Sequence, residues 1–463
     1  MRAGAWLALA LAGATAGCAL RRSDTFLPAQ PGVSQPQRAK DSPIAHVVLI
    51  VQENRTFNDF FATFPGADGT IKGEVKPNAQ CGISKEETIP LQKMGLVTKL
   101  HGTPHDLTHT YSAYMKARDA SAMDGFDDVV FRTGGDECRF PYQYTDPNDI
   151  KPYWQLARKY ALAEHMFTTQ GSNSFTAHQD LIAGDTTIGE AGALIDLPSC
   201  SGSQCVWGCD APHGTSTSLI TKDNVYKEGA GPFPCLTYPT LRNLLDAKRV
   251  SWRYYVPPIC CSLYGRQFSA FDAIKAVRYG SEWTDGHIVS PQTKIIGDIK
   301  AKRLAGVTWV IPDEVDSDHP GTDSDSGPSW VANIVNTIGK SAYWKSTAIV
   351  IVWDDWGGLY DNLKPPQLGY GGLGFRVPAI VVSAYAKPGY LSKTQYEFGG
   401  ILHYIEDNWR LGTLQRSDKR AASIGDCFDY SQKPIAFTPV VPKYPMTYFL
   451  ERKPSYLPVD DDM

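Results

Sequence analysis

The chain has 463 residues, of which 42% are hydrophobic and 20% charged. This composition is that of a globular protein with enough apolar material for a large core. The formal net charge is -4 and the isoelectric point is near 6.2, so no basic field attracts polyanions. We therefore expect no nucleic-acid partner.

The first 18 residues have the pattern of an export signal. Arg2 is followed by an apolar, alanine-rich stretch from Ala5 to Ala14, which is too short to span a bilayer as a mature helix. Small residues at 15–17 stand directly before Cys18, an ending that resembles a bacterial lipoprotein signal with a lipidated cysteine. This pattern predicts a periplasmic or outer-membrane lipoprotein tethered through Cys18. Cleavage without lipidation, which gives a secreted protein, is the alternative.

Residues 19–42 are rich in Pro, Gln and Arg and show no apolar period, which predicts a flexible linker before a folded body at 43–463. Within that body, residues 192–234 are rich in Gly, Ser, Pro and Cys. We interpret this stretch as a disulfide-tied insertion rather than a second core.

The cysteines after position 18 agree with export. An oxidising compartment favours disulfides, with one cysteine left over from nine. A zinc cluster of Cys200, Cys205, Cys209 and His213 is the alternative, but the spacing lacks the usual paired-ligand form. The nine cysteines are Cys81, Cys138, Cys200, Cys205, Cys209, Cys235, Cys260, Cys261 and Cys427.

Four continuous apolar runs of strand length lie in the folded body, at 46–52, 306–311, 347–353 and 377–383. Such runs are typical of strands buried on both faces of a parallel sheet. Helical patterns lie between them, for instance at 329–338 and 399–409. The alternation predicts an α/β fold, a three-layer α/β/α sandwich with a central, mainly parallel sheet.

Oxygen-bearing side chains follow two of these runs. Glu53 and Asn54 come after the first, and Asp354 and Asp355 after the third. Ligands of open α/β sheets bind outside the carboxyl ends of the strands, so the four side chains are expected around one point. Three carboxylates repel one another unless a cation lies among them, and an all-oxygen set favours Mg²⁺, Mn²⁺ or Ca²⁺. Singly, each residue could equally cap a helix or form a turn.

Ser174 lies between a possible strand at 160–167 and the apolar residues 181–184. A serine at a strand-to-helix turn has its hydroxyl near helix N–H groups that suit a phosphate. A nearby metal would lower the pKa of its hydroxyl and make it a nucleophile. The alternative is a serine that only caps the helix.

The segment from Glu53 to Phe57 resembles the Glu-Asn-Arg-Ser-Phe opening of a phosphoesterase family that includes bacterial acid phosphatases and phospholipases C. Similar segments follow in the family's order, so the resemblance covers about residues 46–434. They are Asp106–His109, Met123–Phe126, Ser174–Gln179, Pro312–Pro320, Asp354–Asp361, Arg376–Pro378 and Asp426–Pro434.

This resemblance implies a fold like that of the alkaline phosphatase superfamily and a hydrolase that forms a phosphoserine at Ser174. It implies that His109 and His319 contact the phosphoryl oxygens or protonate the leaving group. His178 matches a variant of the nucleophile motif, as either a catalytic or a structural residue. The implied ligands of one divalent metal are Glu53, Asn54, Asp354 and Asp355.

Three positions depart from the family pattern and leave the substrate open. Asn58 and Asn362 replace a frequent Asp and His, which removes possible charged groups near the site, and Thr176 replaces a usual Pro.

Three functions are compatible with the sequence. The first is hydrolysis of phosphate monoesters, as in acid phosphatases. The second is phospholipase C-type hydrolysis of phospholipid head groups, which requires an aromatic cage if the head group is choline. The third is a surface lipoprotein that binds without catalysis, since fold does not guarantee function. The candidate cage residues are Trp207, Tyr254, Tyr255 and Trp356.

Overall fold

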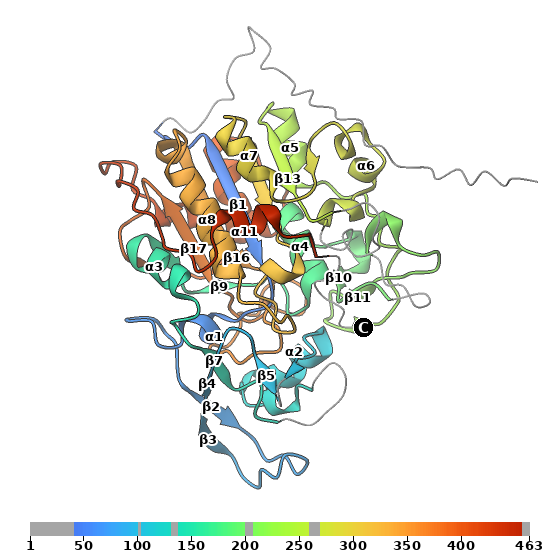
Figure 1. Cartoon of the computed structure of the whole chain (residues 1–463). Coiled ribbons are helices and arrows are strands. Elements are labelled where there is room, and N and C mark those ends of the chain that lie inside the picture. Colours follow the sequence, from blue (N-terminus) through green and yellow to red (C-terminus); the bar gives the residue numbers. More distant parts are fainter. Residues whose placement is uncertain (1–40, 101–102, 131–137, 200–206, 259–268, 456–463) are drawn as a thin grey trace, which may run out of the picture. The chain divides into compact units, whose positions relative to one another are not determined.

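The computed structural model describes residues 41–100, 103–130, 138–199, 207–258 and 269–455 (Figure 1). An eight-stranded sheet runs in the order β14-β13-β15-β1-β16-β17-β8-β18. Its strands are β1 (His46–Gln52), β8 (Ala161–Ala163), β13 (Trp252–Tyr255), β14 (Ile288–Val289), β15 (Val307–Val310), β16 (Thr347–Trp353), β17 (Ala379–Ser383) and β18 (Tyr390–Ser392).

The sheet is mainly parallel, as the sequence predicts. Of its eight strands, β17 alone runs against its neighbours β16 and β8. The register of β1 on β16 pairs His46 with Thr347 and Gln52 with Trp353. The two strands therefore end side by side, and the residues that follow them leave the sheet at the same edge.

Two groups of helices cover the sheet and complete the α/β/α arrangement (Figure 1). In one group, α8 contacts three other helices and β16; in the other, α4 contacts α5 and α9, and α9 contacts α10. The first group is α3 (Lys151–Lys159), α7 (Lys294–Lys300), α8 (Gly327–Gly339) and α11 (Met446–Glu451), and the second is α4 (Ser174–Ala183), α5 (Leu241–Ala247), α9 (Gly399–Trp409) and α10 (Ser417–Arg420).

The predicted elements are largely confirmed. Strands β1 and β16 have the predicted bounds, and every residue of β16 and β17 is buried, which explains their unbroken apolar sequences. Helices α8 and α9 also form where expected. The single strand predicted at 160–167 is wrong. It is divided into β8 and β9 (Met166–Phe167), and β9 pairs with β19 (Tyr396–Glu397) outside the main sheet.

A second, smaller hydrophobic cluster lies beside the main core. Phe126 packs in it against Trp356, Tyr360 and Phe375, with ring centroids 4.9 to 6.1 Å apart. The Met123–Phe126 motif thus contributes packing beside the loop that follows β16. The chain between β1 and α3 forms α1 (Phe57–Phe61), whose phenylalanines belong to the main core, and α2 (Tyr111–Arg118), β2 (Lys72–Val75), β3 (Glu87–Pro90), β4 (Gln92–Met94), β5 (Lys99–Leu100), β6 (Thr103–Pro104) and β7 (Gln143–Thr145).

The cysteine-rich stretch forms a three-stranded sheet of β10 (Ala193–Ile195), β11 (Ser218–Ile220) and β12 (Tyr226–Lys227). Its strands add residues to the second cluster. Disulfides join Cys209 to Cys235 and Cys81 to Cys138. Cys209 is thus no zinc ligand, and the disulfide prediction is confirmed for these four residues. Cys427 is a buried free thiol, and Cys200, Cys205, Cys260 and Cys261 lie outside the described residues.

The predicted export signal and residues 19–40 of the predicted linker also lie outside the described residues. Ser42, still within that linker, donates to Asn408 Oδ1 and accepts from the backbone N–H of Ile44. None of the helices in the described ranges has both the length and the apolar character needed to cross a membrane.

Candidate active site

The turns after β1 and β16 are joined through the side-chain carboxylate of Asp354, which accepts from backbone N–H groups. Asn54 adopts a left-handed conformation, with φ of 58°, which asparagine tolerates better than most residues. Its N–H donates to Asp354 Oδ1 at 2.8 Å, and the N–H of Asp355 donates to the same oxygen at 2.8 Å. Gly357 is required beside this turn, because a Cβ there would lie 2.3 Å from the carbonyl oxygen of Asn54. The structure thus brings the four predicted ligands together.

Ser174 is the first residue of α4, and its hydroxyl faces this cluster. Ser174 Oγ lies 3.1 Å from Asp355 Oδ2 and 3.4 Å from both Glu53 Oε2 and Asn54 Oδ1. All four residues are buried. Asn173, rather than Ser174, is the residue at the N-cap of the helix. The hydroxyl of Ser174 is therefore directed at the carboxylates and not used as a cap.

The residues present fit a divalent cation. Asp354 Oδ2 is buried and accepts no hydrogen bond within the described ranges. A buried carboxylate oxygen without a hydrogen-bond donor requires a positive charge nearby, which a protonated His178 at 3.6 Å or a bound cation would supply. Together with the side-chain oxygens of Glu53, Asn54 and Asp355, it supplies the kind of donor set that divalent cations bind in proteins.

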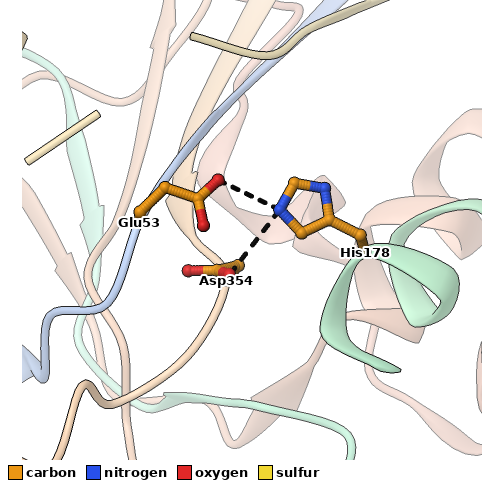
Figure 2. Close-up of side chains that lie close together, drawn as sticks. All are labelled: Glu53, His178 and Asp354. Carbon is orange, nitrogen blue, oxygen red and sulfur yellow. Dashed lines mark hydrogen bonds and ion pairs between the residues drawn. The ribbon is translucent and has the colours of Figure 1, made fainter. Parts of the chain in front are cut away.

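His178 lies on the other side of Glu53. Its Nε2 is 3.0 Å from Glu53 Oε1 and 3.6 Å from Asp354 Oδ2 (Figure 2). Burial alone would lower the pKa of His178, but the two carboxylates raise it to about 10. Burial and the charge of Asp354 raise the pKa of Glu53 to about 8. Burial opposes ionisation of Asp354, yet the interaction with His178 Nε2, 3.6 Å away, holds the pKa of Asp354 below its usual value. His178 thus belongs to the charged cluster, a position that the sequence did not assign.

His109 contacts the predicted ligand Asn54. An amide nitrogen can only donate, so Asn54 Nδ2 donates to His109 Nε2 at 2.8 Å. The proton of His109 is then on Nδ1, which donates to the carbonyl of Leu107 at 2.8 Å. His109 Nε2 also lies 3.8 Å from Asp355 Oδ2. This arrangement turns Asn54 Oδ1 toward Ser174.

His319 lies next to His109, with ring centroids 6.2 Å apart. The N–H of Gly321 donates to His319 Nδ1 at 3.2 Å, which places the proton of a neutral ring on Nε2. His319 Nε2 is 4.0 Å from Asp106 Oδ2. The motifs at 106–109 and 312–320 therefore meet at one side of the cluster.

Asp318 forms hydrogen bonds with residues that directly precede the site residues in the chain. It was not singled out from the sequence. Its Oδ2 accepts hydrogen bonds from Gln52 Nε2 at 3.1 Å, Tyr153 Oη at 2.6 Å and Trp353 Nε1 at 3.2 Å. Burial raises the pKa of Asp318 to about 6, although these donors and Arg55 favour the charged form. Gln52, Trp353 and Asp318 directly precede Glu53, Asp354 and His319. An acidic residue inside the 312–320 motif was the only signal for this role.

The departures from the family pattern have structural partners outside the ligand cluster. Asn58 Oδ1 accepts from the N–H of Thr70 at 2.8 Å, and Asn58 Nδ2 donates to its carbonyl at 3.1 Å. Asn362 Oδ1 accepts from Arg376 at 2.9 Å. Thr176 Oγ1 donates to the carbonyl of Asn173 at 3.2 Å. Each of these side chains holds surrounding backbone or a neighbouring side chain in place.

The candidate aromatic cage is not formed. Tyr255 donates to Asp298 at 2.7 Å, and Trp356 Nε1 donates to the carbonyl of His109 at 3.1 Å. Tyr254 packs against Phe271 and Trp309, and Trp207 against Phe175. Because the four side chains are buried in separate packing contacts, they do not surround a common cation.

Comparison with known proteins identifies the family to which the chain belongs. A model of the phosphoesterase family matches residues 44–412. The chain therefore belongs to the phosphoesterase family, whose class is that of hydrolases acting on phosphoric ester bonds.

Several curated relatives are named phospholipases C. The chain is 24% identical to a non-hemolytic phospholipase C of Burkholderia pseudomallei, over 90% of this chain and 63% of that protein. It is 25% identical to phospholipase C A of Mycobacterium tuberculosis, over 90% of this chain and 82% of that protein. The chain thus spans less than two thirds of the first of these relatives. A solved protein in the alkaline phosphatase superfamily from Vibrio parahaemolyticus superposes with a TM-score of 0.33, at 11% identity over 60% of this chain and 65% of that one. A similarity with so low a TM-score supports no conclusion about this protein.

Proposed function

We propose that this protein is an exported phosphodiesterase of the phospholipase C kind, with Ser174 as its nucleophile. The observation that carries the proposal is the position of Ser174 Oγ, within 3.4 Å of side-chain oxygens of Glu53, Asn54 and Asp355. The names of the relatives favour phospholipid diesters over the monoesters that the sequence put first. Export rests on the pattern of residues 1–18.

The four oxygen ligands would hold one divalent cation, with Mg²⁺, Mn²⁺ or Ca²⁺ favoured by oxygen donors. When bound, the cation would neutralise charge on the phosphoryl oxygens and lower the pKa of the Ser174 hydroxyl. Its ligands would be Glu53, Asn54, Asp354 and Asp355.

The protein's own residues would carry two displacements. Ser174 Oγ attacks phosphorus and loses its proton to Asp355 Oδ2, the nearest carboxylate oxygen at 3.1 Å. As the Oγ–P bond forms, the bond from phosphorus to the glycerol oxygen breaks, and that oxygen takes a proton from His319 Nε2. Water then attacks the phosphoserine and gives a proton back to His319, while the bond from phosphorus to Ser174 Oγ breaks and that oxygen recovers its proton from Asp355, so that the phosphorylated head group is released. His109 keeps Asn54 oriented throughout.

Hydrolysis of phosphate monoesters is the second candidate. It is favoured by the burial of Trp207, Tyr254, Tyr255 and Trp356, which leaves a choline head group without the expected cage. A monoester offers phosphoryl oxygens alone and needs no such cage.

Paired substrates separate the two candidates. Hydrolysis of p-nitrophenylphosphorylcholine and of phosphatidylcholine vesicles is compared with that of p-nitrophenyl phosphate, with and without a chelator. We expect faster cleavage of the diesters, and a loss of roughly 10⁴-fold or more in Ser174→Ala. Ser431→Ala, at an exposed serine, serves as the matched control and should retain full activity. Preference for the monoester would support the second candidate. No cleavage of any ester from acidic to alkaline pH with added divalent metal would remove both and favour the non-catalytic binding role.

A further inference from the structure

The position of His178 suggests a role beyond a hydrogen bond to Glu53. His178 follows Ser174 by four residues on α4, so the two side chains lie on one face of the helix. Glu53 stands between them, with Oε2 toward Ser174 at 3.4 Å and Oε1 toward His178 at 3.0 Å. Figure 2 shows the imidazole directed at both Glu53 and Asp354. The face of α4 that carries the nucleophile therefore also presents a nitrogen to the predicted metal ligands.

The separations fit ligands of one cation. Two atoms bound at about 2.1 Å lie about 3.0 Å apart at an angle of about 90°, and about 3.6 Å apart at about 120°. His178 Nε2 lies 3.0 Å from Glu53 Oε1 and 3.6 Å from Asp354 Oδ2. The ligand atoms of these three residues all lie within 4.8 Å of one another. Asp354 Oδ2, which accepts no hydrogen bond within the described ranges, is the oxygen that faces the imidazole.

We infer that His178 binds the divalent cation directly through Nε2, with the cation in place of the proton that this nitrogen otherwise holds, an inference that rests on the proposed metal site. The site would then combine oxygen ligands with one nitrogen. Imidazole suits Mn²⁺, Fe²⁺, Co²⁺ and Zn²⁺ better than Mg²⁺ or Ca²⁺, so His178 shifts the preferred metal toward the transition ions. The expectation from the sequence was an all-oxygen set.

Pulsed electron paramagnetic resonance on the Mn²⁺-loaded protein tests this directly, because a bound imidazole nitrogen couples to the electron spin. We expect that coupling in the wild type and its loss in His178→Gln. His403→Gln is the matched control, since His403 is half-buried on α9 and contacts the carbonyl of Ala421 and Asp407. That variant should keep the coupling. A wild type that binds Mn²⁺ without nitrogen coupling, or a His178→Gln variant that keeps it, would overturn the inference.

Metal affinity supplies a second readout. Loss of an outer-shell partner weakens metal binding by about 10- to 100-fold. Loss of a direct ligand should therefore weaken Mn²⁺ binding by more than that in His178→Gln, and Mg²⁺ binding by less than Mn²⁺ binding. An equal loss for the two ions would place His178 outside the ligand shell. If His178→Gln fails to fold, the wild-type spectrum keeps the inference falsifiable, because Mn²⁺ bound without any nitrogen coupling contradicts it.

The inference and the proposed function fail in different ways. Ser174→Ala should retain the nitrogen coupling while losing ester hydrolysis. A protein that shows the coupling but hydrolyses no ester would refute the proposed function and leave His178 as a ligand. An active enzyme whose bound Mn²⁺ shows no nitrogen coupling would support the proposed function and exclude His178 as a ligand. Absence of any bound divalent metal, measured by elemental analysis after loading, would overturn both.

Discussion

Ser174 Oγ and Asp355 Oδ2 lie 3.1 Å apart although the two residues are 181 positions apart in the chain. One begins α4 and the other follows β16, so the contact exists only when the helix packs at the carboxyl edge of the sheet. The same carboxylate lies 3.8 Å from His109 Nε2. Asp355 is therefore the residue through which the nucleophile, the predicted metal ligands and a histidine meet.

Asp355→Asn should impair both catalysis and metal binding. The change keeps the size of the side chain but removes the charge that receives the Ser174 proton, so kcat should fall by about 10²- to 10⁴-fold. The apparent Kd for the activating metal should rise in the same variant. Asp223→Asn, at an exposed aspartate, is the control and should change neither quantity. Unchanged kcat in Asp355→Asn would contradict the proton-acceptor role.

Gly357→Ala tests whether the joined turns hold the ligands. The new Cβ would lie 2.3 Å from the carbonyl oxygen of Asn54, and the backbone at φ of 57° disfavours a side chain. Gly189→Ala is matched, since Gly189 has φ of 68° with no atom within 4 Å of its added Cβ. Both variants should lose about 1–2 kcal/mol of stability from the left-handed backbone. Only Gly357→Ala should also weaken metal binding, as measured by calorimetric titration. Equal effects on metal binding would show that the close approach is unimportant.

The raised pKa of Asp318 predicts that the stability of the folded protein depends on pH. Its pKa is raised from 3.8 to about 6 in the folded protein, so folding favours the protonated form. The resulting stability is fully present below the unfolded pKa and is lost as pH rises through the folded one. The loss should amount to about 3 kcal/mol between roughly pH 4 and pH 6. Asp318→Asn retains an acceptor for Gln52, Tyr153 and Trp353 but cannot ionise.

Urea unfolding of wild type and Asp318→Asn at several pH values checks this prediction. The free energy of unfolding of the variant, relative to wild type, should increase as pH rises across that window. Asp407→Asn is the control, because the Asp407 side chain is 67% exposed. A constant difference between Asp318→Asn and wild type would mean that Asp318 does not titrate there.

Arg452 should stabilise the loop that carries His319. Its guanidinium lies 2.7 Å from Asp313 and 2.6 Å from Asp316, both of which are buried. Arg452→Met would leave two buried carboxylates without their cation, which should cost about 3 kcal/mol. Thermal unfolding measures the change, with Lys364→Met as an exposed control of the same charge change. A melting temperature equal to that of the control would contradict this role.

The sequence was sufficient to predict strands β1, β15, β16 and β17 and the ligand residues that follow β1 and β16. Buried parallel strands such as β1 and β16 have continuous apolar sequences, and Glu53 and Asp354 are visible directly after them. The reversed direction of β17 was not predictable, because an apolar run does not encode its orientation.

The contacts that tertiary packing creates within the site were not predictable either. Asp318 and Gln52 are 266 positions apart, and their bond follows from the pairing of β15 with β1. His178 reaches Glu53 only because α4 presents that face to the sheet edge. The prediction that aromatic residues form a choline cage was wrong, because the sequence does not distinguish a ring packed in the core from one that lines a site.

In the proposed mechanism Ser174 becomes covalently bonded to phosphorus, and stereochemistry at phosphorus tests this step most directly. A diester made chiral at phosphorus is hydrolysed, and the configuration of the product is compared with that of the substrate. Two successive in-line displacements, by Ser174 and then by water, predict retention of configuration. Inversion would show that water attacks the substrate directly, and would contradict the account.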